Sequence, residues 1–268
     1  MIAPVTPGTQ DAALEYLARS PYLNVFIAHV LLHDSPALRR NVALAFGGDR
    51  VIGVAYYGRQ IVIAADDAAI PLFGEHAKRH PGERMIVGPR EIVRRFWSAV
   101  EGWHTSPRLV RDRQHVMMVD REHLRPFERR VAVRRARPEE WSAVAESSAA
   151  MIRQELAYDP RRGSEFGEGI RQMIERKLWW VGRSEDALCF FCNIGPWNAQ
   201  TVQLQGIWTP PDLRGRGLAT AALAAVCERL FEVSPTISLY VNDFNDAAIA
   251  LYRRVGFREV GEFQTILF

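Results

Sequence analysis

A glycine-rich turn near the C-terminus offers a site for an anion. Arg214, Gly217 and Ala219 follow the spacing R-x-x-G-x-A within TPPDLRGRGLATAALAAV, after a strand-like run and directly before a helical one. Glycine tolerates the positive φ angles that let successive backbone N–H groups point into one concavity. The helix that follows adds free N–H groups and the positive end of its dipole. We expect this turn to suit a pyrophosphate.

Two further residues downstream have types that could take part in chemistry. Asn245 stands at the start of the helix-like segment DAAIALYRRV, where a capping role alone would account for it. Tyr252 follows on the same segment, and a phenol can protonate or stabilise a leaving group at hydrogen-bond distance. A buried tyrosine with a satisfied hydroxyl is the alternative interpretation.

The second half of the chain predicts the elements that position these residues. Leu223, Val226, Cys227 and Leu230 share one face of a helix after the turn, and Gly256 suits a left-handed cap at the end of the next helix. The predicted order is β-α-α-β-β-β-α-β-α-β. The expected ranges are strand 130–136, helices 138–152 and 163–177, strands 178–183, 188–195 and 201–209, helix 218–231, strand 236–242, helix 246–255 and strand 257–268.

The first half predicts a similar sequence of elements without an obvious identity of residues. One or two helices over 11–33 are interrupted by Pro21, and a tight Gly-Gly-Asp turn joins two strands. The expected ranges are strands 41–48, 50–58 and 60–66, helix 67–79, strand 84–89, helix 92–100 and strand 113–120. The pattern divides near residues 121–130, so we expect two α/β domains, 1–125 and 126–268.

Residues 131–268 resemble the GNAT (Gcn5-related) N-acetyltransferase superfamily. The resemblance is strongest in GIWTPPDLRGRGLATAAL, similar to its FR47-like branch, and in LYVNDFNDAAIALYRRVGF. It implies an α/β fold in which each domain is a mostly antiparallel sheet with a splayed parallel strand pair, flanked by helices. The first half would be a degenerate GNAT-like domain, because it has no R-x-x-G-x-G/A and carries Asp66 and Asp67 at the matching helix start, where they would repel phosphate.

The resemblance also implies roles for particular residues. Acetyl-CoA would be the acyl donor, its pantetheine arm lying along the strand end and its pyrophosphate on the turn. Tyr252 would be the catalytic acid for the departing thiolate, and Asn245 would contact coenzyme A. The donor-binding set implied by the resemblance is Ile207, Trp208, Thr209, Arg214, Gly215, Arg216, Gly217, Leu218, Ala219, Thr220 and Asn245.

No general base stands where relatives place one. Many of them use a carboxylate on or near the strand before the glycine turn, whereas this strand carries Gln203 and Gln205. An amide orients a water or an acceptor but does not take a proton at neutral pH. The amine acceptor would therefore lose its proton to solvent or to a residue of another element, such as Glu155, or it would have a low pKa of its own.

Composition sets the limits of this interpretation. The net charge of +3, from 34 basic and 31 acidic residues, gives no strong field toward nucleic acid or an anionic membrane. We interpret the arginine-rich run 125–137 as a solvated connector and edge strand. No run reaches the roughly 18 apolar residues of a membrane span, and the N-terminus does not read as a signal peptide. Three cysteines fit a reducing compartment, so we expect a cytoplasmic protein.

Other candidate sites are weaker. Cys189 and Cys192 form a C-x-x-C on a predicted strand, where residues three apart face opposite sides, and we interpret them as core residues. The central hairpin is strongly aromatic, and we expect most of its rings in the core and the remainder against an acceptor. These residues are Trp179, Trp180, Phe190, Phe191 and Trp197. The histidines are scattered, and we expect no metal dependence.

The sequence therefore favours an acyl-CoA-dependent N-acetyltransferase. It would move an acetyl group to a primary amine of a small molecule or peptide by direct attack in a ternary complex, without nucleic-acid or membrane partners, as a monomer with pseudo-dimeric halves. An acyl-CoA-binding sensor without turnover is the alternative. Aminoacyl-tRNA-dependent transferases also have two such domains, but the intact turn and the lack of a basic groove count against them.

Overall fold

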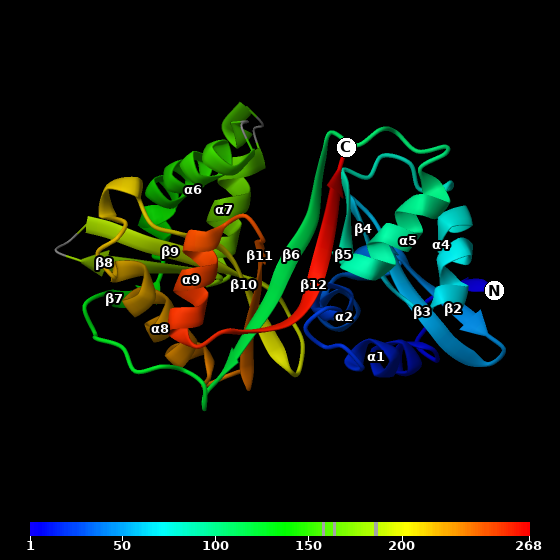
Figure 1. Ribbon diagram of the computed structural model, residues 1–268, viewed down its shortest axis with the longest axis horizontal. Helices are drawn as coiled ribbons and strands as arrows, with labels where there is room; N and C mark the ends of the chain where they lie inside the picture. The colour runs from blue at the N-terminus through cyan, green and yellow to red at the C-terminus, as the bar shows by residue number, and fades with distance from the viewer. Residues whose placement is uncertain (157–158, 163–164, 185–186) are drawn as a thin grey trace.

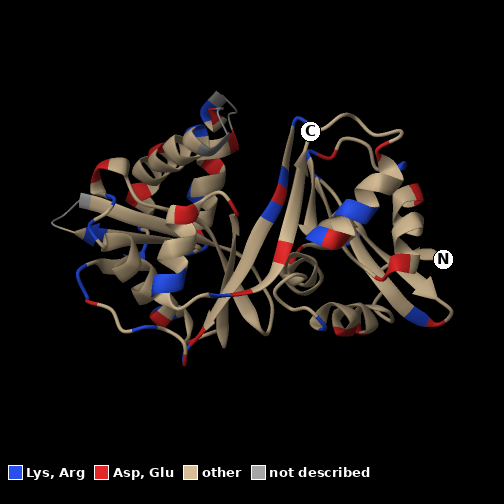
Figure 2. Cartoon of the chain, in the orientation of Figure 1, with Lys and Arg blue, Asp and Glu red and all other residues tan. Residues whose placement is uncertain are grey.

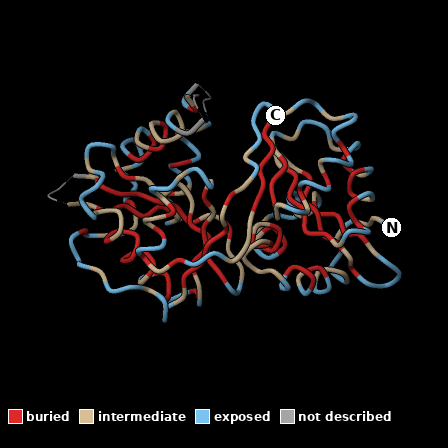
Figure 3. The backbone as a smooth tube through the Cα atoms, viewed as in Figure 1, coloured by how far each residue is buried: buried red, intermediate tan, exposed pale blue. Residues whose placement is uncertain are grey.

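One continuous mixed sheet runs through the whole molecule, with helices flanking it (Figure 1). The computed structural model describes residues 1–156, 159–162, 165–184 and 187–268. The sheet has twelve strands in the order β1-β2-β3-β4-β5-β12-β6-β11-β10-β9-β8-β7. Figure 3 shows buried backbone along the strands of both halves and exposed backbone mostly in the loops and on the outer sides of the helices. The predicted α/β class is confirmed.

The first half contains the predicted elements and two short additions. The helical segment before His33 is two helices separated at Pro21, as expected. The additions are the edge strand β1 and the one-turn helix α3, and β6 begins at Leu109, four residues before the predicted start at 113. The elements are β1 Ile2–Pro4, α1 Gln10–Ala18, α2 Val25–His33, α3 Pro36–Arg39, β2 Val42–Gly47, β3 Arg50–Tyr57, β4 Gln60–Ala65, the 3-10 turn η1 Asp67–Ala69, α4 Ile70–Ala77, β5 Met85–Pro89, α5 Arg90–Val100 and β6 Leu109–Asp120.

The second half follows the predicted order throughout. Gly256 ends α9 with φ 116°, the left-handed cap expected of it. The predicted start of the second helix at 163–164 lies outside the described residues. The elements are β7 Ala132–Arg135, η2 Pro138–Glu140, α6 Trp141–Leu156, η3 Pro160–Arg162, α7 Glu165–Glu175, β8 Trp179–Ser184, β9 Ala187–Trp197, β10 Thr201–Trp208, η4 Pro211–Leu213, α8 Leu218–Leu230, β11 Thr236–Asn242, α9 Asp246–Val255 and β12 Arg258–Leu267.

The two halves repeat one arrangement. Each strand from β1 to β6 has a counterpart six places later, and the sheet order reads the same from both ends when the counterparts are exchanged. The helices match as well: α1 and α2 correspond to α6 and α7, and α4 and α5 to α8 and α9. This repeat confirms the tandem fold class, with one parallel strand pair, β4–β5 or β10–β11, in each half.

The last strand of each half lies in the sheet of the other half. Strand β12 pairs with β5 and β6, whereas β6 pairs with β11 and β12. Figure 1 shows β6 and β12 side by side at the centre of the molecule. The proposed domains 1–125 and 126–268 thus each contain one copy of the repeat in sequence. In space, however, the final strand of each range pairs with a strand of the other range.

Four core clusters fill the spaces between helices and sheet. The cluster beneath α4–α5 and the cluster beneath α8–α9 are separate from each other. The cluster beneath α1–α2 reaches Val116 of β6 and Phe263 of β12, the two strands at the centre of the sheet. The cluster of α6–α7 contains Trp179 and Phe191. Among the predicted aromatic core residues, Trp179, Trp180, Phe190 and Phe191 are buried, as expected. Only Trp197 of that group is partly exposed.

The two cysteines of the C-x-x-C are free and fully buried. Both belong to the core cluster beneath α8, and the pairing of β9 with β8 has an irregularity beside Cys189. Within the described ranges no three histidine, cysteine or carboxylate side chains lie close enough to hold a metal. None of the helices described here has the length and apolar character needed to cross a bilayer. Basic and acidic residues are interspersed over both halves (Figure 2).

The strand exchange predicts that neither half folds alone. A fragment of residues 126–268 would lack β6, leaving the ladder edge of β11 unpaired, and a fragment 1–125 would lack β12 beside β5. We expect each fragment to be largely unfolded by circular dichroism and the mixed fragments to regain native signal. The intact chain should unfold in a single transition. A cooperatively folded 126–268 fragment would contradict this.

Candidate functional site

The site begins where two parallel strands separate. Strands β10 and β11 pair over only three positions, from Thr201 with Thr236 to Gln203 with Ser238. Beyond them β11 continues along β6, while β10 stays with β9. Gly206 has φ 58° within an irregular stretch of the β9–β10 ladder, a bulge that bends β10 away. The sequence analysis did not single out Gly206, although an isolated glycine within a strand pattern is a signal for a bulge.

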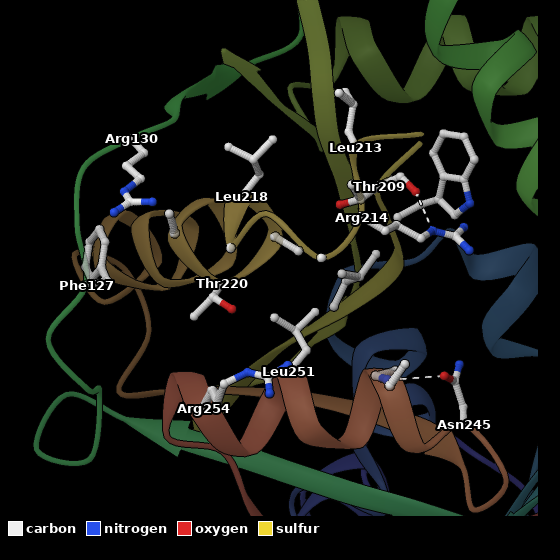
Figure 4. Close-up of a pocket in the computed structure, with 18 of the residues that line it drawn as sticks. Phe127, Arg130, Thr209, Leu213, Arg214, Leu218, Thr220, Asn245, Leu251 and Arg254 are labelled. Carbon is white, nitrogen blue, oxygen red and sulfur yellow. Dashed lines mark hydrogen bonds between the residues drawn. The ribbon is translucent and has the colours of Figure 1, made fainter. Parts of the chain in front are cut away.

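A cavity of about 1070 Å³ opens in this gap (Figure 4). Its walls are the end of β10, the glycine turn, the first turn of α8, one face of α9 and the connector after β6. The residues that line it are Pro126, Phe127, Glu128, Arg130, Met151, Gln154, Ile207, Trp208, Thr209, Leu213, Arg214, Gly215, Gly217, Leu218, Ala219, Thr220, Ala221, Asn242, Phe244, Asn245, Ala247, Ala248, Leu251 and Arg254. All predicted donor-binding residues except Arg216 therefore meet at one cavity.

The glycine turn has the backbone geometry expected of an anion site. Gly215 and Gly217 have φ angles of 75° and 77°, and Gly217 is the N-cap of α8. The backbone amides of residues 215–220 donate to no acceptor in the described part of the chain. At the start of any helix four backbone N–H groups have no partner within the helix, and here the glycine turn contributes further unpaired N–H groups. Thr220 projects into the space between α8 and α9, where its hydroxyl adds a further hydrogen-bond donor to these backbone amides (Figure 4).

The side chain of Arg214 braces the turn from behind. Its Nε donates to the carbonyl of Thr209 over 3.0 Å, and one terminal nitrogen donates to Oε1 of Gln154 over 3.2 Å. The guanidinium also lies 5.9 Å from the ring centre of Trp208. Arg214 therefore fixes the conformation of the turn against β10 and α6, and its own backbone N–H donates to the carbonyl of Pro211 over 3.3 Å.

The positive charge of the cavity comes partly from residues that the sequence analysis did not assign to a site. Arg254 of α9 lines the cavity and forms no ion pair with any described residue. Arg130 also lines it, paired with Glu128, which is the one acidic residue among the described residues of the lining. The expected solvated connector and edge strand are both present in the run 125–137, since residues 128–130 are exposed and β7 is the last strand of the sheet. In addition, the connector passes beside α8 and lines the cavity. A repeat that exchanges its strands gives no local signal of this approach.

Two buried polar groups at the end of β10 have no hydrogen-bond partner among the described residues. They are Oγ1 of Thr209 and Nε1 of Trp208, and Thr209 is only 7% exposed. Leaving such groups unsatisfied costs free energy, about 1–3 kcal/mol each. Both residues line the cavity, but these two atoms are buried and are not exposed at its surface.

The two asparagines near the start of α9 are both held in place. Oδ1 of Asn245 accepts from the backbone N–H of Ala248 over 3.2 Å, which is the expected capping bond, so its amide nitrogen remains for a ligand. Oδ1 of Asn242 accepts from the Gln114 amide over 3.0 Å. Gln114 belongs to β6, so a strand of the first half orients a side chain of this cavity. Phe244 lies between the two asparagines and is 72% exposed at the rim.

Tyr252 lies at the buried edge of the site. Its side chain is 6% exposed, belongs to the core cluster with Ile249, and has its ring centre 5.9 Å from that of Phe257. Tyr252 is not part of the cavity lining, but Ala248, one helical turn before it, and Leu251 are. The phenol is therefore adjacent to the cavity wall rather than within it.

The glutamines of β10 face away from the donor cavity. Val202 and Leu204 pack in the core beneath α8, so Gln203 and Gln205, which alternate with them, lie on the opposite face of the sheet. Gln203 is 3% exposed and accepts a hydrogen bond from the Gln205 amide over 3.4 Å. The side chain of Glu155, a candidate base, lies outside the described part of the structure.

The matching place in the first half is filled by its own side chains. Strands β4 and β5 also pair over only three positions, but a Cβ on Gly88 would lie 3.2 Å from the carbonyl oxygen of Ile63, so the strands remain close. Asp67, at the start of η1, forms an ion pair with Arg95 of α5. Closed strands and a paired carboxylate leave no equivalent anion site there, in agreement with the expected degeneracy.

Two protein-family models match the chain. Residues 142–257 match the acetyltransferase (GNAT) family, and residues 42–144 match a domain of unknown function, DUF4081. The two matches overlap at residues 142–144, in the first turn of α6. A comparison with curated proteins gave no match.

Several solved structures share the complete fold at low sequence identity. A Drosophila protein superposes with a TM-score of 0.71 at 14% identity, over 100% of this chain and 98% of its own. A GCN5-related N-acetyltransferase from Sphaerobacter thermophilus gives 0.65 at 15% identity, over 99% and 94%. A tandem GNAT protein from the clavulanic acid biosynthesis pathway gives 0.57 at 15% identity, over 99% and 97%. At these identities the likeness concerns the fold.

Proposed function

We propose that this chain, which contains a domain of the GNAT acetyltransferase family at residues 142–257, transfers an acetyl group from acetyl-CoA to a primary amine. One observation carries the proposal. The turn R-x-x-G-x-A, with its free backbone amides, forms one wall of a cavity, and the place where β10 and β11 separate forms another. An anion site joined to exposed strand backbone suits a donor with both a pyrophosphate and amide groups.

Different residues of the second half would bind different parts of the donor. The amides of residues 215–220 and the hydroxyl of Thr220 would hold the pyrophosphate. Arg254 and Arg130 would add positive charge for further phosphate oxygens. The backbone of Ile207 and the backbone N–H of Thr209 would bond the pantetheine amides, because β10 no longer pairs with β11 there. Asn245 would contribute its amide nitrogen.

The chemistry would be a direct transfer. A neutral amine attacks the thioester carbonyl, the new C–N bond forms and the C–S bond breaks. The sulfur takes a proton from the Tyr252 hydroxyl, the nitrogen loses its extra proton to water, and the Tyr252 phenolate regains a proton from water, so that the enzyme returns to its starting state. All three cysteines are buried in the core beneath α8, so none is placed to carry the acyl group.

An acyl-CoA sensor without turnover is the second candidate. The observation that favours it is the pair of glutamines at the strand positions where relatives have a carboxylate. Coenzyme A binding with no thiol release on any amine would support the sensor and overturn the transferase.

The glycine turn predicts a selective loss of donor binding in Gly217→Val. Any L side chain at φ 77° is strained, so the turn must change conformation and move its amides. We expect at least a tenfold weaker affinity for coenzyme A by calorimetry. Gly48→Val is the matched control, because Gly48 has φ 64° in the β2–β3 turn and, like Gly217, no atom within 4 Å of an added Cβ. Equal affinities of the two variants would refute the assignment.

The position of Tyr252 predicts a loss of turnover rather than of binding. Without a proton donor for the thiolate, Tyr252→Phe should lower kcat by roughly a hundredfold or more, with coenzyme A affinity nearly unchanged. Tyr57→Phe is the control: it removes another buried hydroxyl, which bonds the carbonyl of Phe73 over 2.9 Å, far from the site. It should lower the melting temperature and leave kcat intact. An undiminished kcat in Tyr252→Phe would remove the tyrosine from the mechanism.

A further inference from the structure

A second cavity of about 280 Å³ lies between α2 and the central strands of the sheet. Both halves build it. The first half contributes Leu23, Val25, Phe26, His29, Gln60, Val62 and Val87, and the second half contributes Pro196, Gln203, Gln205, Tyr240 and Phe263. Its volume is that of a small molecule, since one water occupies about 30 Å³ in the liquid.

The two cavities adjoin the same strand. Gln203 and Gln205 line the second cavity, the bulge at Gly206 follows at once, and residues 207–209 line the donor cavity. The glutamines lie on the opposite face of the sheet from the donor cavity, so a molecule held at them lies across β10 from the place where the two strands separate and the reactive end of a donor would arrive. This proximity distinguishes the second cavity from an unrelated void in the core.

Among the described residues that line this cavity there is no aspartate, glutamate, lysine or arginine. Its polar groups are the amides of Gln60, Gln203 and Gln205, the phenol of Tyr240 and the imidazole of His29. Burial lowers the pKa of His29, which keeps the ring neutral near pH 7. Its Nδ1 lies 3.2 Å from the backbone nitrogen and the carbonyl oxygen of Trp197, which hold the ring in place.

Two amides lie together at one end of the cavity, since Gln203 and Gln205 are next to the bulge. Val62, Val87, Phe26 and Phe263 provide aliphatic and aromatic surface, and Gln60 and His29 add uncharged polar groups beside it. Such a lining suits a molecule with an apolar body and an amine, because amide oxygens accept from an amine and none of the described lining residues carries a charge for a second ammonium group.

We propose that this central cavity is the acceptor site, and that the acceptor is a primary amine on a small, uncharged, apolar or aromatic body. The inference rests on the proposed transferase function. The amine nitrogen lies at the Gln203–Gln205 end, toward the donor, and the body lies against the wall supplied by the first half. Polyamines, aminoglycoside-like polycations and lysine-rich peptides are poor acceptors, because no carboxylate here balances a second charge.

The same absence of charge bears on how the acceptor loses its proton. An ammonium group transferred into this cavity gives up water without gaining a counter-ion, and desolvation lowers its pKa. Its proton passes to water, and the neutral amine that attacks is the form that the cavity favours. A carboxylate at position 203 or 205 would instead hold the ammonium form, so the two glutamines agree with this route.

The test measures acceptor binding separately from turnover, with 2-phenylethylamine and putrescine as probes. We expect 2-phenylethylamine to bind the intact protein by calorimetry or NMR and to be acetylated with a kcat/KM at least tenfold above that of putrescine. Val62→Phe, which fills the cavity from the first half, should raise KM for 2-phenylethylamine at least tenfold and leave coenzyme A affinity within twofold.

Val51→Phe is the matched control, because Val51 is a similarly buried valine of the same core cluster outside the cavity lining. It should change neither constant. If Val62→Phe does not fold, Gln203→Leu replaces it and should lower kcat/KM for 2-phenylethylamine at least tenfold, again with coenzyme A affinity intact.

The outcomes separate the two proposals. Binding of 2-phenylethylamine that Val62→Phe abolishes, with no thiol release on any amine, would leave the cavity assignment standing and overturn the transferase function. Acetylation of putrescine in preference to 2-phenylethylamine, or an unchanged KM in both cavity variants, would overturn the acceptor site while the transferase function survives.

Discussion

The central constraint on this structure is that β10 and β11 cease to pair after three positions. Backbone groups that leave a ladder must find other partners, and within a protein an unsatisfied group is costly. The bulge at Gly206 turns β10 aside, the glycine turn ends it, and α8 begins with its amides aimed into the same gap. Three features that each leave hydrogen-bonding capacity unused thus converge on one cavity, which is the arrangement expected of a ligand site rather than of a packing defect.

The gap is stable because β11 is held from its other side. Strand β6 pairs with β11 along its whole length, from Thr236 with Asp120 to Asn242 with Gln114. A buried chain of hydrogen bonds crosses these strands, in which the hydroxyl of Thr265 donates to Gln114 and the Gln114 amide donates to Asn242. The first half therefore supports the proposed donor site structurally, although its sequence has no R-x-x-G-x-G/A.

Much of this could be predicted from local patterns. The R-x-x-G-x-A spacing, the N-cap at Asn245 and the cap at Gly256 each depend on neighbouring residues, and the structure has the predicted turn, cap and helix end there. The strand exchange could not be predicted, because β6 and β12 have the same strand pattern whichever neighbours they choose. The approach of Arg130 to the cavity follows from that exchange, and so was missed. Periodicity placed Gln203 and Gln205 on a strand, but not beneath a helix of the other half.

The repeat also makes the divergence of the two halves visible position by position. Val62 pairs with Val87 at the end of the β4–β5 ladder, where Gln203 pairs with Ser238 at the end of β10–β11. Val62 and Gln203 are thus equivalent residues, and both line the central cavity. The half that keeps the anion-binding turn has the amide, and the half whose strands have closed together has the valine. Because the pseudo-symmetry brings both positions to one cavity, the two halves contribute different side chains at equivalent positions of a single cavity.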